Sequence, residues 1–158
     1  EREGRFLLID AFSPSPEEIF FVSDRADVEE FTYVIAQAVA QLPKPCRVVV
    51  DSMTTVAVNF EVREFLYLVY EKNRIFRESP VVVMDIYLAD TFQGSEMAAV
   101  VNSYDLALEL FVSEERGGFP KRSLRLRKLR GGTYDPRPYP FTIRPHQGIV
   151  VDSEYYRE

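Results

Sequence analysis

The segment Val48–Ser52 (VVVDS) is the most informative one for chemistry, because an acid follows three consecutive valines. An uninterrupted apolar run is typical of a parallel strand that is covered on both faces. A carboxylate at the carboxyl end of such a strand lies on the edge where open α/β sheets bind ligands. In P-loop nucleotide hydrolases an acid at this place holds the magnesium ion or its water. Asp51 is therefore a candidate nucleotide-site acid, and the alternative is that it only caps the loop after the strand.

A second candidate is the pair Lys128 and Arg130, which stand two residues apart in an extended segment. Strand alternation predicts that both side chains lie on one face, and two long cations on one face suit a phosphate group. The alternative is an edge strand whose cations block pairing with other chains. The same alternation predicts that Arg125 and Arg127 lie on the opposite face, in solvent or paired with acids.

The charge is unevenly distributed along the 158 residues, whose net charge is −6. Residues 116–144 hold nine basic residues and one acid, whereas the rest of the chain holds ten basic residues and twenty-four acids. A basic segment on an acidic body indicates an anion contact, a solvated face or a contact with another copy. The net charge excludes a polycation built for nucleic acid.

Three further residues have types that can take part in chemistry. Asp10 ends an apolar segment, but no partner for it can be named. The only histidine, His146, is interpreted as a loop residue, and its being alone excludes a His-rich metal site. The only cysteine, Cys46, is interpreted as a small core or partly exposed residue. A single cysteine excludes an internal disulfide and fits a reducing cytoplasm.

Elements that would position these residues follow from hydrophobic periodicity. Apolar runs predict strands at 5–10, 47–51 and 81–86. Helices are expected from Asp24 or Asp27 to about Leu42 and from Asn59 to about Arg77. The expected inner face of the second helix is listed as Val62, Phe65, Leu66, Val69, Asn73 and Phe76. This alternation predicts a parallel sheet with helical crossovers.

The remaining segments predict an antiparallel end to the sheet. Residues 88–104 are expected to form a long loop. Residues 105–112 and 123–130 flank Gly117–Gly118 and are expected to form a hairpin that turns there, and 141–144 and 149–152 are expected to be two short strands. No apolar run reaches the ~18 residues of a membrane span, and no signal peptide is visible. We predict one α/β domain over residues 1–158. The first residue is Glu1, and we expect a fragment or a processed chain.

Taken in order, these segments resemble a known family. The ordered set comprises 3–11 (EGRFLLIDA), 47–55 (RVVVDSMTT), 126–131 (LRKLRG), 139–143 (YPFTI) and 148–151 (GIVV). It is similar to the KaiC-like branch of the RecA superfamily, of the archaeal type. The resemblance covers nearly the whole chain.

The resemblance implies a RecA-like three-layer fold and an ATPase core that assembles into a ring, usually a hexamer, with ATP and Mg²⁺ between subunits. It implies that Asp51 is the Walker B acid and that Ser52 hydrogen-bonds near the metal. It also implies that Lys128 and Arg130 reach the ATP of the neighbouring subunit. The nucleotide would then supply the negative charge that balances the cations of the basic strand, residues 123–130.

The sequence departs from that family in three respects. No Gly-x-x-x-x-Gly-Lys-Ser/Thr loop occurs in the 158 residues, and the acidic pair that activates water is absent too, so we expect a domain truncated at its N-terminus that does not hydrolyse ATP efficiently alone. Asp85 stands where the family often has an uncharged sensor, and a second acid there would repel phosphate. Gly132–Tyr134 (GTY) replaces the familiar Thr-Ser-His.

Two other functions compete with the ATPase core. The first is a non-catalytic scaffold or regulatory module that binds protein partners through the same surfaces. The second is single-stranded nucleic acid binding through residues 88–104 and the basic strand. The acids Asp90, Glu96 and Asp105 disfavour the latter, because they repel phosphates.

Overall fold

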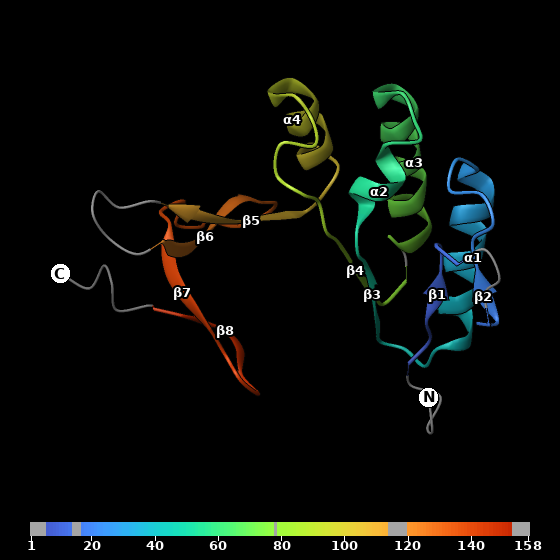
Figure 1. Ribbon diagram of the computed structural model, residues 1–158, viewed down its shortest axis with the longest axis horizontal. Coiled ribbons are helices and arrows are strands. Elements are labelled where there is room, and N and C mark those ends of the chain that lie inside the picture. Colours follow the sequence, from blue (N-terminus) through green and yellow to red (C-terminus); the bar gives the residue numbers. More distant parts are fainter. Residues whose placement is uncertain (1–5, 14–16, 78, 114–119, 153–158) are drawn as a thin grey trace. The chain divides into compact units, whose positions relative to one another are not determined.

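The computed structural model describes residues 6–13, 17–77, 79–113 and 120–152. The chain divides into two compact units, residues 1–103 and residues 104–158. The first unit contains parallel strand pairs and helices, and the second contains an antiparallel sheet (Figure 1). The expected α/β class, with parallel strands, helical crossovers and antiparallel C-terminal strands, is confirmed. The single domain over residues 1–158 stays a prediction.

The first unit is built from two parallel strand pairs and the helices that connect them. The pairs are β1 (Ile9–Asp10) with β2 (Phe20–Phe21), and β3 (Cys46–Val50) with β4 (Val81–Asp85). The helices are α1 (Val28–Gln41), α2 (Met53–Ala57), α3 (Val62–Phe76) and α4 (Gly94–Asn102). The short elements β2 and α2 were not predicted, and β1 is shorter than the expected strand at 5–10.

Helix α1 begins and ends as its sequence predicts. Asp27 is the N-cap, and its side chain accepts a hydrogen bond from the backbone N–H of Glu30 at 2.9 Å. Leu42 ends the helix directly before Pro43, which cannot continue it. The buried face of α1 carries Phe31, Ile35, Ala38 and Val39.

Helix α3 begins at Val62 with Glu61 as its N-cap, two residues after the expected cap Asn59, and Glu61 and Glu64 form a capping box. Its buried residues are Phe65, Leu68, Val69, Lys72 and Phe76. The inner face therefore differs from the prediction, because Lys72 and Leu68 replace Asn73 and Leu66 as fully buried positions. The prediction erred because it treated a lysine as an outer residue.

Strands β3 and β4 pair in parallel, and their side chains alternate between two faces. Val48 pairs with Val83 and Val49 with Met84. Val49 is 59% exposed and Met84 is 58% exposed, whereas Val48 and Val83 are half-buried. The expectation that β3 is covered on both faces is therefore wrong for the described chain, in which one face of this pair is open.

The expected loop at 88–104 contains helix α4, which begins after the capping box formed by Gln93 and Glu96. Val100 of α4 is buried, and α4 contacts α3. The sequence signal that was missed is the spacing of Gln93 and Glu96, which is that of a helix start.

The second unit is a four-stranded antiparallel sheet in the order β5-β6-β7-β8. Its strands are β5 (Leu106–Ser113), β6 (Lys121–Leu129), β7 (Tyr139–Arg144) and β8 (Gly148–Val151). The four strands correspond to the expected hairpin and the two expected short strands. The turn expected at Gly117–Gly118 lies outside the described residues.

Candidate functional site

Asp51 lies at the carboxyl end of β3, as predicted. The adjacent strand β4 ends level with it, because Val50 pairs with Asp85. The pairing continues past both strands, since the Ile86 N–H donates to the Val50 carbonyl at 3.0 Å and the Met53 N–H donates to the Ile86 carbonyl at 2.9 Å. Asp51 is exposed, Ser52 is half-buried, and the peptide bond between them is cis. The carboxylate is thus available to a ligand at this edge.

A threonine pair connects the segment after Asp51 to the segment after β4. The Leu88 N–H donates to the Thr54 hydroxyl at 2.9 Å, and that hydroxyl lies 3.2 Å from the hydroxyl of Thr91. Thr91 donates in turn to the Leu88 carbonyl at 2.7 Å. These bonds hold the start of α2 against the loop before α4. Sequence reasoning missed both threonines, because residues 37 positions apart carry no local pattern that pairs them.

Asp85 points into the first unit and is paired with the buried lysine of α3. Lys72 Nζ lies 2.7 Å from Asp85 Oδ2, and the two side chains are 1% and 0% exposed. In a buried pair of this kind each charge compensates the other where solvent cannot. The concern that Asp85 adds a second acid beside a phosphate is therefore corrected, since its charge is balanced by Lys72 and withdrawn from the edge.

The same lysine begins a polar connection to the end of the first unit. Lys72 Nζ donates to Asn73 Oδ1 at 2.9 Å, and Asn73 Nδ2 donates to the Ser103 carbonyl at 3.3 Å. Ser103 caps the C-terminus of α4 and is buried. The signal that could have found Lys72 is its helical spacing from Phe65, Leu68 and Phe76.

In the second unit, the register of β5 and β6 decides which cations share a face. Arg125 pairs with Glu109 and Lys128 with Ala107, and the register shifts between Ala107 and Leu108. Arg127 is thus the extra residue of a β-bulge. Paired residues share a face, and Glu109 and Ala107 are two positions apart on β5. Arg125 therefore lies on the same face as Lys128, and the predicted opposite placement of Arg125 is wrong.

Lys128 and Arg130 remain on one face, as predicted, because the bulge precedes both residues. Lys128 is half-buried and Arg130 is exposed directly after the end of β6. The Arg130 N–H donates to the Asp105 carbonyl at 2.7 Å, which extends the β5–β6 pairing by one position. The face therefore presents two cations near the end of the hairpin.

Three ion pairs form here around two acids, Asp105 and Glu109. Arg130 Nη1 lies 2.8 Å from Asp105 Oδ1, with side chains that are 52% and 80% exposed. Glu109 accepts from Arg125 Nε at 2.6 Å and lies 3.9 Å from Arg127 Nη1. The Arg125 guanidinium also lies 5.5 Å from the centre of the Phe111 ring. The expectation that Arg125 and Arg127 pair with acids is confirmed.

A third charged cluster lies between β6 and β7. The Arg137 guanidinium and the Tyr139 hydroxyl both donate to Asp135. The hydrogen bonds from Arg137, and then the one from Tyr139, hold the pKa of Asp135 well below its ordinary value of 3.8. The Asp135 carboxylate raises the pKa of Tyr139 above its ordinary value of 10.0. The cluster is a local turn support.

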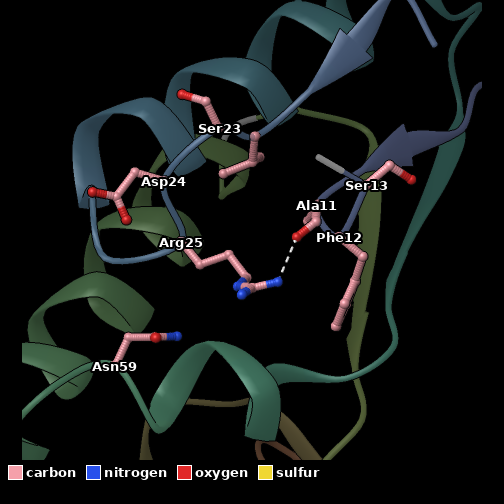
Figure 2. Close-up of a pocket in the computed structure, with 8 residues that line it drawn as sticks. Ala11, Phe12, Ser13, Ser23, Asp24, Arg25 and Asn59 are labelled. Atoms are coloured by element: carbon pink, nitrogen blue, oxygen red, sulfur yellow. Dashed lines mark hydrogen bonds between the residues drawn. The ribbon is translucent and has the colours of Figure 1, made fainter. Parts of the chain in front are cut away.

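A polar cavity of about 200 Å³ is lined by the segments that follow β1 and β2 and by Asn59, which lies between α2 and α3. Figure 2 shows Arg25 directed across it toward Ala11, whose carbonyl accepts from Arg25 Nη1 at 2.9 Å. The same guanidinium lies 4.9 Å from the centre of the Phe12 ring. These contacts hold the loop after β1 against the segment before α1.

Asp10, the strand-end acid without a predicted partner, turns the chain after β1. Its Oδ1 accepts from the N–H groups of Phe12 and Ser13 at 2.8 and 3.0 Å. Hydrogen bonds from Ser13, and then from Phe12, lower the pKa of Asp10. The acid is therefore engaged in loop geometry.

His146 and Cys46 lie where the sequence interpretation put them. His146 is exposed in the turn between β7 and β8 with a φ of 62°. Cys46 is the half-buried first residue of β3. Neither residue contributes to the edge that carries Asp51.

The donors at the Asp51 edge suit magnesium bound together with a phosphate. No group of three or more His, Cys, Asp or Glu residues that could hold a metal occurs in the described part of the chain. Mg²⁺ commonly takes one or two carboxylates and completes its shell with water and substrate phosphates. The exposed carboxylate of Asp51 and the adjacent Ser52 hydroxyl fit that mode.

The four predicted site residues fall into two groups. Asp51 and Ser52 belong to the first unit, and Lys128 and Arg130 belong to the second. Within each group the two residues are neighbours, as the sequence predicts.

None of the helices in the described ranges is long and apolar enough to cross a membrane.

Comparison with known proteins gives consistent matches over most of the chain. A family model described as "ATPase: KaiC" matches residues 1–156. A UPF0273 protein of Pyrococcus furiosus is 30% identical over 156 residues, which cover 96% of this chain and 62% of that protein. A UPF0273 protein of Thermotoga maritima is 30% identical over 162 residues, which cover 98% of this chain and 65% of that protein.

A solved structure of a KaiC-like protein from Pyrococcus horikoshii matches the fold. Its TM-score is 0.62 at 27% identity, and the match covers 80% of this chain and 54% of that chain. The chain spans less than two thirds of the length of the curated relatives it matches.

Proposed function

Because the chain belongs to the KaiC family of ATPases, within the RecA-like superfamily, we propose that it contributes to a magnesium–ATP site shared by neighbouring copies in a ring. In this proposal Asp51 holds the magnesium ion or its water, and Ser52 hydrogen-bonds near the metal. Lys128 and Arg130 contact the triphosphate bound to the adjoining copy. A hexamer is the ring size that the family resemblance favours.

The observation that carries the proposal is that the two acids at the ends of β3 and β4 differ in solvent exposure and in ion pairing. Asp85 is buried in an ion pair with Lys72, whereas Asp51 is exposed at the sheet edge. A ligand at this edge therefore meets a single available carboxylate from these two strand ends. One carboxylate beside a hydroxyl supports binding of Mg²⁺ as its phosphate complex.

The roles follow from the chemistry of the side chains. A magnesium ion held by Asp51 would supply charge neutralisation to the phosphates of a bound nucleotide. Asp51 orients the metal's water shell as a charged acceptor, and Ser52 can accept or donate a hydrogen bond beside it. Lys128 acts as a point charge, whereas the planar guanidinium of Arg130 can donate two parallel bonds to phosphate oxygens.

Mg-ATP binding by the 158-residue chain tests the proposal. We expect millimolar Mg-ATP to raise the Tm, because a ligand that binds the native state stabilises it by mass action. Asp51→Asn should remove the magnesium-dependent part of that rise. Glu29→Gln, which makes the same charge change at an exposed position in the first turn of α1, should leave it intact. An equal rise in the Asp51→Asn variant would refute the assignment of the acid.

The shared site predicts that nucleotide drives association. Sedimentation velocity with Mg-ATP should give a larger species than sedimentation without it. Lys128→Gln and Arg130→Gln should each reduce the larger species, because they remove the contact to the neighbour's phosphates. Nucleotide-independent sedimentation in the wild type would count against the ring.

A regulatory scaffold without hydrolysis is the second candidate function. The 158 residues contain no Gly-x-x-x-x-Gly-Lys-Ser/Thr loop, whose backbone amides and lysine cradle phosphates. Under this candidate the same surfaces bind protein partners, and Mg-ATP leaves the Tm unchanged. The thermal measurement therefore separates the two candidates.

A further inference from the structure

Asp105 and Arg130 face each other at the open end of the β5–β6 hairpin. Asp105 directly precedes β5, and Arg130 directly follows β6. Arg130 Nη1 lies 2.8 Å from Asp105 Oδ1, and the Arg130 N–H donates to the Asp105 carbonyl at 2.7 Å. A carboxylate thus meets the same guanidinium that the proposed function directs at a phosphate.

The pair is exposed enough to exchange partners. The Asp105 side chain is 80% exposed and the Arg130 side chain is 52% exposed. Exposed ion pairs contribute little to stability, because solvent screens them and both side chains lose freedom. A triphosphate offers more negative charge and more acceptor oxygens than one carboxylate, so it can displace Asp105 from Arg130.

A second ion pair on the same sheet face provides the contrast. The Glu109 side chain is 32% exposed, less than half the exposure of Asp105, and it is shared by Arg125 and Arg127. Arg125 is also placed beside the Phe111 ring. Glu109 is therefore held by several contacts, whereas the Asp105 carboxylate projects into solvent.

We propose that Asp105 is a built-in competitor that occupies Arg130 until a phosphate group takes its place. The proposal rests on the proposed function and adds a residue that sets the affinity of the basic strand for phosphate. Asp105 lowers that affinity in two ways. The ligand must first break the ion pair, and the displaced carboxylate then remains near the bound anion and repels it.

The test measures binding of inorganic tripolyphosphate to the 158-residue chain by isothermal titration calorimetry at low, constant ionic strength. Asp105→Asn should tighten binding by about two- to fivefold, the range expected from removal of an exposed ion pair. Glu109→Gln is the matched control, because Glu109 lies on the same sheet face and the variant also removes one negative charge. It should change the Kd much less than Asp105→Asn does.

The variants Arg130→Gln and Lys128→Gln separate failure of this inference from failure of the proposed function. If Arg130→Gln weakens binding and Asp105→Asn does not tighten it, the competitor role is overturned and the basic strand keeps its assignment. If neither Arg130→Gln nor Lys128→Gln weakens binding, or if the wild type does not bind millimolar tripolyphosphate, both fail. If Asp105 had only a structural role, Asp105→Asn would lower the free energy of unfolding in urea and leave the Kd for tripolyphosphate unchanged.

Discussion

The ammonium of Lys72 lies 2.7 Å from the carboxylate of Asp85, and both side chains are withdrawn from solvent. Removing one partner leaves the other charge buried. We therefore expect Lys72→Met to lower the free energy of unfolding by about 3–5 kcal/mol. The double variant Lys72→Met/Asp85→Leu should recover a large part of that loss, because neither charge remains. Urea unfolding of the single and double variants measures both effects, and a single-variant loss below about 1 kcal/mol would contradict the prediction.

The threonine pair behind Asp51 predicts a smaller and local effect. Thr54→Val removes the acceptor of the Leu88 N–H and the contact with the Thr91 hydroxyl, and we expect a loss of about 1–2 kcal/mol in the free energy of unfolding. Thr55→Val is the matched control, because Thr55 is also half-buried and its hydroxyl has only a long 3.4 Å contact with Ser52. Amide hydrogen exchange at Leu88 should accelerate in Thr54→Val alone. Equal exchange rates at Leu88 in the two variants would argue against the role of the threonine pair in holding this loop.

The aromatic cluster of the first unit predicts a third result. Phe65 is 0% exposed and stacks on Phe92 with ring centres 5.3 Å apart, and Tyr87 meets it edge-on at 6.2 Å. We expect Phe65→Ala to cost about 3–5 kcal/mol, because it removes a large buried ring and leaves a cavity. Tyr67→Ala changes an aromatic residue of the same helix that is 60% exposed, and it should stay within about 0.5 kcal/mol. Similar losses in urea unfolding would refute the placement of the core.

Asp135 predicts a pH dependence in the acid range. Its folded-state pKa lies below the ordinary value of 3.8, so the unfolded chain binds more protons between the two values. The contribution of Asp135 to stability is therefore present above the ordinary value and is lost as the pH falls toward the folded pKa. An NMR titration of the Asp135 carboxyl checks this directly, and a midpoint at or above the ordinary value would contradict it. Arg137→Gln should move the midpoint upward, because the hydrogen bonds of Arg137 are the main cause of the shift.

The positions of the candidate residues within their own elements could be predicted from sequence. Asp51 lies at a strand end because three β-branched residues precede it and proline and glycine are absent from the run. Lys128 and Arg130 share a face because side chains alternate along an extended segment and the bulge precedes both residues. The helix ends at Asp27 and Leu42 follow from a capping acid and a following proline.

Local rules failed where a contact joins distant parts of the chain. Arg125 was assigned to the wrong face because the bulge at Arg127 adds one residue to the count, and no glycine marks it. Lys72 was left out of the core because a buried lysine is rare without a partner, and that partner is 13 residues away on β4. Helix α4 was predicted as a loop because residues 88–104 contain a glycine and small residues and show no clear apolar period.

For this protein, the sequence by itself determined the class of fold, the strand-end position of Asp51 and the shared face of Lys128 and Arg130, since each depends on a pattern of neighbouring residues. Only the tertiary structure decided that Asp85 is neutralised by Lys72, that Thr54 holds the loop beside Asp51, and that Asp105 faces Arg130. Those contacts form only when helices pack on strands and the strand register is fixed. The contact energies that favour this arrangement act between residues that no local sequence period connects.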